Sequence, residues 1–447
     1  MSPQAVTIAV VIPAYNCSEF LIRSLEALAR SADPPDECIV VDDGSNDGTA
    51  EAVRSFSAPG LIVKVMTTGG RRGPAHARNI GARASSSSVL WFIDSDVCVH
   101  SGTLGGIRRA FEHDSELAAL IGCYDDSPEN QDFVSQYKNL MHHHVHQRAR
   151  ESATTFWSGC GAVRRPVFLE MTGFNEVQYQ RPSIEDIELG YRMRSSGHKM
   201  ILDREIQVKH LKRWTFWNLV KTDVRDRGIP WTELILRDQN MPDDLNLEIS
   251  QRISVALAFL LLLGAVALAV KWGAFFLVPL FAAVMLMVGR WWVEAAASRN
   301  RLVVAGMTAA MIALVALCKI YHLLALIPIL VLAYGLLFLR HRYSSGGRGA
   351  RMIAVFTAFY LSFSVVSTLV FLPSHWLVKV FLVGLLGVVI LNGHFYLFLA
   401  EKRGRLFAVA AIPLHLLYHL YNALSFAIGM GRFFWGKFRL SSASIRT

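Results

Sequence analysis

The sequence predicts an α/β domain with a Rossmann-like, mostly parallel sheet, followed by an all-α domain of transmembrane helices. Three observations support this fold class: strand-like and helix-like segments alternate in the first half, apolar runs of bilayer length fill the second half, and the two halves differ in charge. Of the 447 residues, 53% are hydrophobic and 18% are charged, against a usual charged share of about 25%. A disordered chain is therefore excluded, and a wholly soluble one is not expected.

Short β-branched runs alternate with amphipathic segments in the first half of the chain. The spacing predicts helices over 18–30, 50–56 and 78–84, with Ser18 as a cap of the first and Ser45 or Asp47 as a cap of the second. The predicted strands are 6–12, 38–41, 61–66 and 89–93. This alternation is typical of a doubly wound parallel sheet, in which ligands bind beyond the carboxyl ends of the strands.

Seven apolar runs follow one another in the second half. Each is close to the roughly 17–25 residues that cross a bilayer: 253–270, 273–289, 302–317, 321–339, 352–372, 376–399 and 406–430. Residues 1–251 carry 27 basic and 33 acidic side chains (net −6), and residues 252–447 carry 18 basic and two acidic ones (net +16). The overall charge of +10 therefore indicates membrane topology, and no nucleic-acid partner is expected.

The basic residues of the second half gather in alternate connections, at 290–301, 340–351 and 402–405. By the positive-inside rule these loops, and with them residues 1–251, face the cytoplasm. The basic tail is also expected inside, whereas seven crossings would place it outside; a re-entrant or interfacial last run would leave six. The sequence therefore leaves both six and seven membrane crossings open.

The cysteines and the first residues bear on the compartment. The six cysteines are scattered with no C-x-x-C pair, so we expect neither a disulfide framework nor a zinc site, and a reducing compartment. No charged segment followed by an apolar run stands at the beginning, so we expect no cleaved signal peptide.

Three polar clusters directly follow predicted strands. They are Pro13-Ala14-Tyr15-Asn16, Asp42-Asp43-Gly44-Ser45 and Asp94-Ser95-Asp96. A single aspartate after a strand is usually a turn residue or a helix cap, but three clusters at equivalent ends of one sheet indicate a binding site. Two carboxylates one residue apart can hold Mg²⁺ or Mn²⁺, and such a cation neutralises a diphosphate.

These clusters and several later motifs resemble the family 2 inverting glycosyltransferases of the A-type (GT-A) fold. The resemblance covers roughly residues 6–215, and its motifs occur in the order typical of that family. Besides the first three clusters they are Gly73-x4-Arg78-Asn79-x-Gly81, Ser158-Gly159-Cys160-Gly161, Gly173-Phe174-Asn175-Glu176 and Glu185-Asp186-Ile187-Glu188. Nothing comparable is recognised in the membrane half.

The resemblance implies a role for each matching residue. Ala14, Tyr15 and Asp43 would contact the nucleotide base and ribose, Arg78 would approach the diphosphate, and Asp186 would be the catalytic base. The full donor-binding set is Pro13, Ala14, Tyr15, Asn16, Asp42, Asp43, Arg78, Asn79, Asp94, Ser95, Gly159, Cys160 and Gly161. The remaining assignments are Asp94, Asp96 and His210 to the metal, Glu185 beside Asp186 to catalysis, and Trp157, Arg213 and Trp214 to the acceptor.

The chemistry of sugar transfer needs these residue types. A carboxylate can take the proton of the attacking acceptor hydroxyl, while a metal and an arginine stabilise the leaving diphosphate. One base and an in-line leaving group give inversion in a single displacement. Glu185 and Asp186 also suit the start of a helix after Ser183, because carboxylates there favour the helix dipole; both interpretations can hold together.

The segment 210–214 and the histidines 142–146 are less specific. His210-Leu211-Lys212-Arg213-Trp214 resembles the Q-x-x-R-W element of processive polysaccharide synthases and ceramide glucosyltransferases, with His in place of Gln. His210 could be the remaining protein ligand of the metal. Trp214 either lines the acceptor entry or belongs to an interfacial segment. For His142 and His146, contact with an acceptor head group is favoured over a dedicated metal site.

The sequence therefore predicts a membrane-bound, metal-dependent inverting glycosyltransferase that moves a sugar from a UDP- or GDP-sugar to a lipid, such as a polyprenyl phosphate or a glycolipid. The expected domains are 1–215 for the transferase, 216–251 for interfacial helices and 252–447 for transmembrane helices. The expected location is a bacterial inner membrane, with a cytoplasmic catalytic domain. A processive polysaccharide synthase is the alternative enzyme. A nucleotide-sugar-sensing transporter is disfavoured because the apolar runs hold no Asp.

Overall fold

The computed structural model describes residues 5–271 and 374–444. The chain divides into two compact units. Unit 1 comprises Met1–Arg252 and Gly393–Gly429, and unit 2 comprises Ile253–Asn392 and Met430–Thr447. The segment 393–429, from the far end of the sequence, thus belongs to the same unit as the α/β half.

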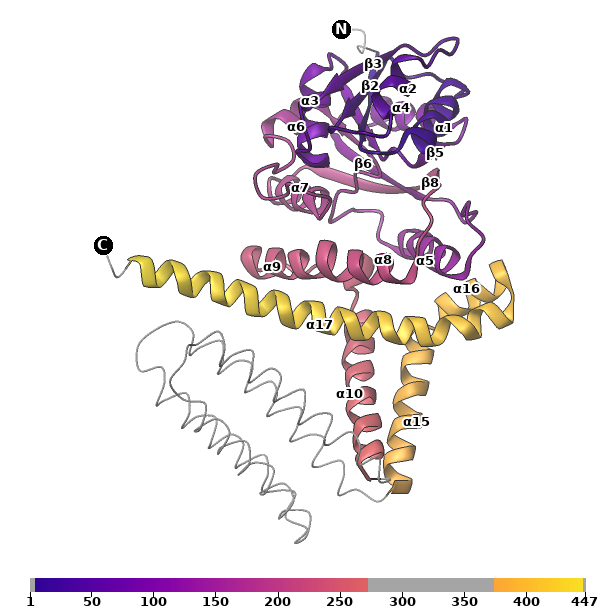
Figure 1. Ribbon diagram of the computed structural model, residues 1–447, viewed down its shortest axis with the longest axis vertical. Helices are drawn as coiled ribbons and strands as arrows, with labels where there is room; N and C mark the ends of the chain where they lie inside the picture. The colour runs from indigo at the N-terminus through magenta and orange to yellow at the C-terminus, as the bar shows by residue number, and fades with distance from the viewer. Residues whose placement is uncertain (1–4, 272–373, 445–447) are drawn as a thin grey trace. The chain divides into compact units, whose positions relative to one another are not determined.

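Unit 1 contains one eight-stranded mixed sheet in the order β3-β2-β1-β4-β7-β6-β8-β5, seen in the upper part of Figure 1. The pairs β1–β2, β2–β3, β1–β4 and β6–β8 are parallel, and the other three are antiparallel. The strands are β1 (Ile8–Ala14), β2 (Glu37–Asp42), β3 (Val63–Thr67), β4 (Val89–Ile93), β5 (Val97–Val99), β6 (Leu117–Tyr124), β7 (Cys160–Arg164) and β8 (Lys199–His210).

The sequence-based prediction of a mostly parallel sheet is correct for β3-β2-β1-β4 and incomplete beyond it. Strand β7 runs antiparallel to both β4 and β6, so the sheet as a whole is mixed. Alternating βα segments predict the first four strands well, because each connects through a helix. The later strands pair across long stretches of sequence, which local patterns do not encode.

Helices cover the sheet and extend beyond it. The first helix begins at Ser18, and its capping position is Cys17 without a side-chain hydrogen bond, so the predicted Ser18 cap is wrong by one residue. The helical elements of this unit are α1 (Ser18–Ala29), α2 (Thr49–Arg54), α3 (Pro74–Ala84), α4 (Thr103–His113), α5 (Phe133–Arg148), α6 (Arg165–Glu170), α7 (Glu185–Ser195), α8 (Phe216–Lys221), the π-helix η1 (Thr222–Gly228), α9 (Ile229–Asp238), the 3₁₀ turn η2 (Leu245–Leu247), α16 (Gly393–Arg403) and the first part of α17 (Arg405–Ser444).

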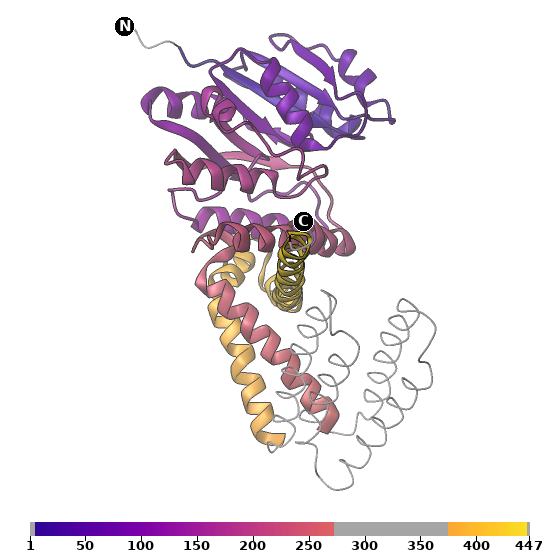
Figure 2. The ribbon, with the colours of Figure 1, turned by 90° about the vertical axis from the view of Figure 1, so that its left-hand side faces the viewer.

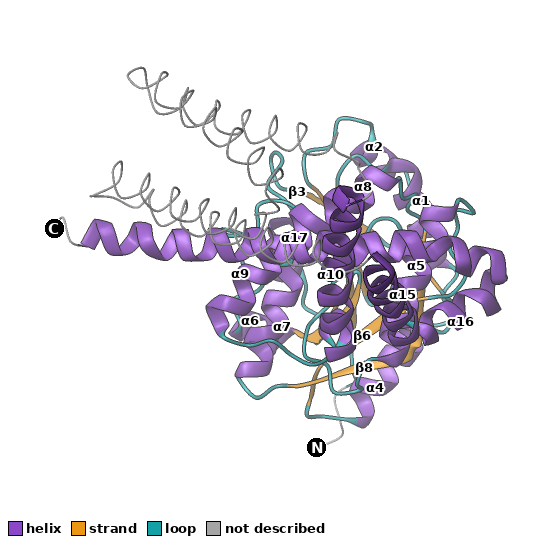
Figure 3. Ribbon diagram, turned by 90° about the horizontal axis from the view of Figure 1, so that it is seen from below, coloured by secondary structure: helices purple, strands orange, loops and turns teal. Residues whose placement is uncertain are grey.

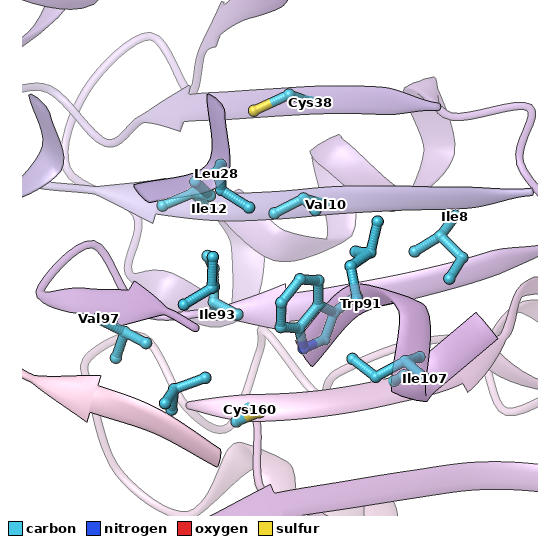
Figure 4. Packing of buried hydrophobic residues seen from close by; sticks show 14 of the residues in the cluster. Ile8, Val10, Ile12, Leu28, Cys38, Trp91, Ile93, Val97, Ile107 and Cys160 are labelled. Carbon is cyan, nitrogen blue, oxygen red and sulfur yellow. The ribbon is translucent and has the colours of Figure 1, made fainter. Parts of the chain in front are cut away.

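Two apolar clusters, one on each face of the sheet, form the core. Side chains alternate along a strand, so Ile8, Val10 and Ile12 pack on the face covered by α1 and α4 (Figure 4). Ala9 and Val11 pack on the opposite face, which includes the buried rings of Phe92, Phe156, Phe168 and Phe174. Burial on both faces holds the strands in place. Because β1 pairs in parallel with both β2 and β4, the carboxyl ends of these three strands lie along one edge of the sheet.

Gly81 lets α3 approach this sheet closely. A Cβ at this position would lie 2.4 Å from Cγ1 of Val11 in β1. The last glycine of the Gly73-x4-Arg78-Asn79-x-Gly81 motif is therefore required by packing, and the close approach places the preceding Arg78 beside the ends of the strands.

The apolar helices agree only in part with the seven predicted runs. Two described helices are long and apolar enough to cross a membrane, Ile249–Ala267 and Arg405–Gly436. The run predicted as one span over 376–399 is divided into α15 (Ser374–Leu391) and α16, which are bent by 65°. The predicted runs 273–289, 302–317, 321–339 and 352–372 lie outside the described residues.

In unit 2, α10 (Ile249–Lys271) and α15 lie side by side, as Figures 2 and 3 show. A Cβ at Gly384 would lie 2.9 Å from Leu261, so glycine permits the close contact. The Asn392 amide donates to the Ser254 hydroxyl at 2.9 Å. Small residues and a buried polar contact are typical of helix pairs in apolar surroundings.

Candidate active site

The first two polar clusters lie at one edge of the sheet. Ala14 and Asp42 end paired strands opposite each other, and the Asp43 amide donates to the Ala14 carbonyl at 2.8 Å. Asn16, at φ +49°, accepts from the Asn46 amide at 2.9 Å and so joins the two loops. Tyr15 is 37% exposed, with the Arg71 guanidinium 4.2 Å from its ring centre. The aromatic face and this cation stand where the resemblance implies a nucleotide base.

Asp42 and Asp43 order the loops of this edge through their carboxylates. Asp43 accepts from the amides of Arg72 and Gly73, both at 2.8 Å. Asp42 accepts from the Ser45 amide at 3.2 Å. Gly73 has φ +95°, and a Cβ there would lie 2.4 Å from the Gln180 carbonyl oxygen. Both aspartates therefore shape the edge, and any contact with a nucleotide would come in addition to these bonds.

Arg78 joins the third cluster to the start of α7. It is buried, and it donates to Asp94 Oδ1 at 2.7 Å and to Glu185 Oε1 at 2.8 Å. Burial opposes its charge, but the two carboxylates outweigh burial and raise the pKa of Arg78. For Glu185, burial raises the pKa although Arg78 opposes this and the adjacent Asp186 adds to it. The arginine is thus a fixed charge between two predicted site residues.

Asp186 is oriented by three hydrogen bonds. Its Oδ2 accepts from the amide and hydroxyl of Ser158, at 3.0 and 3.1 Å, and its Oδ1 accepts from the Ile187 amide at 2.8 Å. Both Glu185 and Asp186 lie in the first turn of α7. The predicted helix start is therefore confirmed. The three hydrogen bonds hold the carboxylate of Asp186 in one orientation.

The motif Ser158-Gly159-Cys160-Gly161 holds Trp157 against the site. A Cβ at Gly159 would lie 2.5 Å from the Trp157 ring, and one at Gly161 would lie 2.4 Å from the Trp157 carbonyl oxygen. Cys160 is buried in the core, and burial raises the pKa of its thiol to about 12. Ser158, the first residue of the motif, bonds Asp186, and the packing around Trp157 accounts for the two glycines.

Asn79 is a buried residue of α3 whose side chain bonds a neighbouring loop. Its amide donates to the Phe174 carbonyl at 2.8 Å and to Glu176 at 2.7 Å, and its oxygen accepts from the Phe174 amide. It thereby connects α3 to the motif Gly173-Phe174-Asn175-Glu176. Its predicted contact with the donor stays a prediction.

Asp96 and His210 face each other where β5 pairs with β8. His210 Nε2 lies 3.6 Å from Asp96 Oδ2, and the Leu211 amide donates to the Asp96 carbonyl at 2.8 Å. Burial would raise the pKa of Asp96, but the interaction with the neighbouring His210, and then with Lys212, outweighs burial and lowers it. Ser95, between the two aspartates, lies in the turn that joins β4 to β5. Within the described residues no three His, Cys, Asp or Glu side chains are grouped closely enough to hold a metal ion.

Aromatic side chains line the site beside His210. Tyr124 stacks on His210, with ring centres 4.3 Å apart and planes 9° apart, and Trp157 meets Tyr124 edge-on at 4.8 Å. Trp214 is buried with its ring centre 6.5 Å from that of His210. Arg213 lies apart from them, because its side chain is 72% exposed and pairs with Asp132. Of the three predicted acceptor residues, the structure brings together the two tryptophans.

Sequence reasoning missed Tyr124 and assigned no role to Asn139. Tyr124 ends β6, which is antiparallel to β7 as β4 is, so its end lies on the same side of the sheet as the Asp94-Ser95-Asp96 cluster. The position after a buried strand could have indicated it. The rings of His142 and His146 are tilted by 31° with centres 4.1 Å apart, and the ring centre of His142 lies 4.6 Å from that of Trp157. Burial lowers the pKa of His146 to about 4, so it is neutral near pH 7.

Comparison with known proteins finds similarity to glycosyltransferases. Residues 9–172 match the model of glycosyl transferase family 2. Validoxylamine A glucosyltransferase from Streptomyces hygroscopicus subsp. limoneus is 28% identical over 227 residues, which are 44% of this chain and 50% of that protein. Glycosyltransferase AglE from Haloferax volcanii is 36% identical over 95 residues, 21% of this chain and 31% of that protein. The chain thus spans about half the length of the first of these relatives.

Two solved structures show weaker similarity. Mannosyltransferase PcManGT from Pyrobaculum calidifontis, in complex with GDP-Man and Mn²⁺, has a TM-score of 0.44 at 16% identity, covering 82% of this chain and 88% of that one. S. aureus TarS 1–349 has a TM-score of 0.39 at 17% identity, covering 52% and 65%. The chain is therefore similar to glycosyl transferase family 2 over residues 9–172.

Proposed function

We propose that this chain is an inverting glycosyltransferase that uses a UDP- or GDP-sugar and a divalent cation to glycosylate a membrane lipid. One observation carries the proposal: the predicted residues, joined by Tyr124, form a continuous series of contacts. Asp94 bonds Arg78, Arg78 bonds Glu185, and the neighbouring Asp186 bonds Ser158. Trp157, next to Ser158, contacts Tyr124; Tyr124 stacks on His210, and His210 faces Asp96. Residues from separate loops are thus linked to one another by contacts, which supports their assignment to one site.

Asp186 is the proposed base. Its Oδ2 is held by two hydrogen bonds from Ser158, whereas its Oδ1 accepts only one, from the Ile187 amide, and so keeps a lone pair that can take a proton. The acceptor hydroxyl or phosphate would be oriented by Asp186 as it attacks the anomeric carbon, opposite the leaving diphosphate. Fixed geometry of this kind accounts for much of the rate of bimolecular transfers.

Asp96 and His210, with Asp94 nearby, are the proposed metal site. The donor set fits Mg²⁺ or Mn²⁺, because such ions are commonly held by one or two protein side chains with substrate phosphates completing the coordination. When bound, the cation would neutralise the charge on the leaving diphosphate. Arg78 adds a buried positive charge beside Asp94, which supports its proposed role near the diphosphate.

The lipid acceptor rests on the apolar helices. Ile249–Ala267 and Arg405–Gly436 have the length and hydropathy of membrane spans. Trp217 in α8 is 76% exposed and lies close in sequence to Lys221 and Arg225, a combination that suits a membrane interface. We therefore propose a multi-pass protein of a bacterial inner membrane, with a cytoplasmic transferase domain over 1–215, interfacial helices over 216–251 and membrane helices over 252–447. A polyprenyl phosphate or a glycolipid would enter along Trp157 and Trp214.

Transfer from a panel of radiolabelled nucleotide sugars to membrane lipid extracts tests the proposal. We expect Asp186→Asn to lower the rate by about 10²–10⁴-fold, the usual contribution of a positioned base, and Asp96→Asn to raise the Mn²⁺ concentration needed. Glu112→Gln, an exposed carboxyl in α4, is the matched control and should leave transfer unchanged. Transfer at the wild-type rate in both site variants would refute the assignment. Products with more than one added sugar would favour the alternative, a processive synthase.

A further inference from the structure

We infer that Asn139 is a positioning residue that fixes the tautomer of His210, so that this ring presents an unprotonated nitrogen to the cation shared with Asp96. The inference rests on the proposed function, since it concerns the metal site proposed there. Asn139 lies in α5, is 2% exposed, and contacts His210 across 71 positions of sequence.

The orientation of the Asn139 amide follows from its neighbours. Its Nδ2 donates to the Ser135 carbonyl at 3.0 Å. A backbone carbonyl can only accept, so the NH₂ group must face Ser135. The amide oxygen is then the atom that lies 2.7 Å from His210 Nδ1. An amide oxygen also only accepts, so Nδ1 of His210 must carry a hydrogen.

The other ring nitrogen therefore has a defined role. A neutral imidazole carries one proton, and with that proton on Nδ1 the lone pair of Nε2 is directed away from Asn139. Nε2 lies 3.6 Å from Asp96 Oδ2, beyond ordinary hydrogen-bond range. Two electron-rich atoms facing each other at this distance repel unless a cation lies between them. The arrangement thus suits a divalent cation bound by one nitrogen and one oxygen.

The plane of the ring is also held in place. Tyr124 stacks on His210 with ring planes 9° apart, and His210 is only 4% exposed. Ligating histidines generally give their second N–H to a fixed acceptor, and loss of that acceptor typically costs about 10–100-fold in metal affinity. Asn139 occupies this place for His210.

Gln136, one turn earlier in α5, provides a matched control. It is 1% exposed, and its amide bonds the carbonyls of Pro128 and Asn130 and the guanidinium of Arg403. It has the same chemistry, helix and burial as Asn139 but is bonded to none of the site residues. Gln136→Leu therefore measures what the loss of a buried amide from α5 does on its own.

Binding of Mn²⁺ to the full-length protein in detergent, followed by the electron paramagnetic resonance of the free ion, tests the inference. Asn139→Leu should weaken Mn²⁺ binding by about 10–100-fold. Asn139→Asp keeps an acceptor for the Nδ1 hydrogen and should restore most of the affinity, and Gln136→Leu should bind as the wild type does. Wild-type affinity in Asn139→Leu, or an equal loss in Gln136→Leu, would overturn the inference.

A second measurement needs no variant at Asn139. Nitrogen-15 shifts of labelled histidines, with His210 assigned by comparison with His210→Gln, should show a protonated Nδ1 and an unprotonated Nε2 in the wild type; the opposite tautomer overturns the inference even if Asn139→Leu does not fold. The variant Asp96→Asn distinguishes a failure of the proposed metal site from a failure of the role of Asn139. If it abolishes Mn²⁺ binding while Asn139→Leu does not, the metal site stands and only the role of Asn139 fails. If the wild type binds no Mn²⁺, the proposed metal fails and the role of Asn139 with it.

Discussion

Glu37 illustrates how a single carboxylate can be stabilised by a local cluster of donors. Its Oε1 accepts from the amides of Ser86 and Ser87, at 3.0 and 2.8 Å, and from the hydroxyls of Ser85 and Ser87. Burial would raise the pKa of Glu37, but these hydrogen bonds outweigh burial and lower it below 4.5. The serine run 85–88 is thereby fixed between α3 and β4.

The lowered pKa of Glu37 makes a prediction about stability against pH. Because the folded pKa lies below the unfolded one, the stabilisation is complete above the unfolded value and is lost as the pH falls through the folded value. Urea unfolding from about pH 7 to about pH 3 should show a shallower decline for Glu37→Gln than for the wild type. Glu51→Gln, an exposed residue of α2, is the control. An unchanged decline in Glu37→Gln would contradict the prediction.

At the same scale, the sequence indicates residues at the ends of strands better than the residues that support them. Asp96 and Asp186 stand in recognisable motifs, and the structure connects both to the same series of contacts. Asn139 could not be predicted, because it acts through His210 and depends on how α5 packs against β8. Gly159 and Gly161 show the converse: a motif names them, but it does not say that their neighbour Trp157 occupies the space a side chain would need.

At the scale of elements, a buried charged group joins three helices of unit 1. Lys138 in α5 donates to both oxygens of Asp223 in η1, at 2.8 and 2.9 Å. The Tyr421 hydroxyl of α17 donates to Asp223 at 2.8 Å. Burial lowers the pKa of Lys138, although Asp223 opposes this. No pattern in the sequence pairs positions 138, 223 and 421, so local reasoning predicts the helices and not their connection.

The contacts of Asp223 predict a large loss of stability when this residue is replaced, and smaller losses when Tyr421 or Asp226 is replaced. Asp223→Ala leaves the Lys138 ammonium buried without its carboxylate, and loss of one partner of a buried pair typically costs about 3–5 kcal/mol. Tyr421→Phe removes one hydrogen bond and should cost about 1 kcal/mol. Asp226→Ala, whose nearest guanidinium is 3.8 Å away and half exposed, should be nearly neutral. Chemical unfolding measures all three, and equal losses for Asp223→Ala and Asp226→Ala would contradict the role of the group.

At the scale of the whole molecule, the division of charge and the apolar helices predict an integral membrane protein. An apolar 18-residue window within Ile249–Ala267 is only 17% buried within the protein, so most of its side chains need another apolar environment. The chain should therefore stay in the membrane pellet after alkaline carbonate extraction. Leu260, exposed in this helix, is a sensitive position, because a charge at the centre of a span costs about 2.5–3.5 kcal/mol on insertion scales.

Leu260→Arg should accordingly reduce the membrane-integrated fraction, whereas Leu260→Ala should not. In inverted vesicles, a tag at the N-terminus should be cleaved by added protease if residues 1–251 face the cytoplasm, as we propose from the basic connections of the second half. Release of the intact wild-type chain by carbonate would contradict this prediction and indicate a peripheral membrane protein. Protection of the tag would instead reverse the orientation and remove cytoplasmic nucleotide sugars as donors, since the site that contains Asp96 and Asp186 lies in the same unit as the N-terminus.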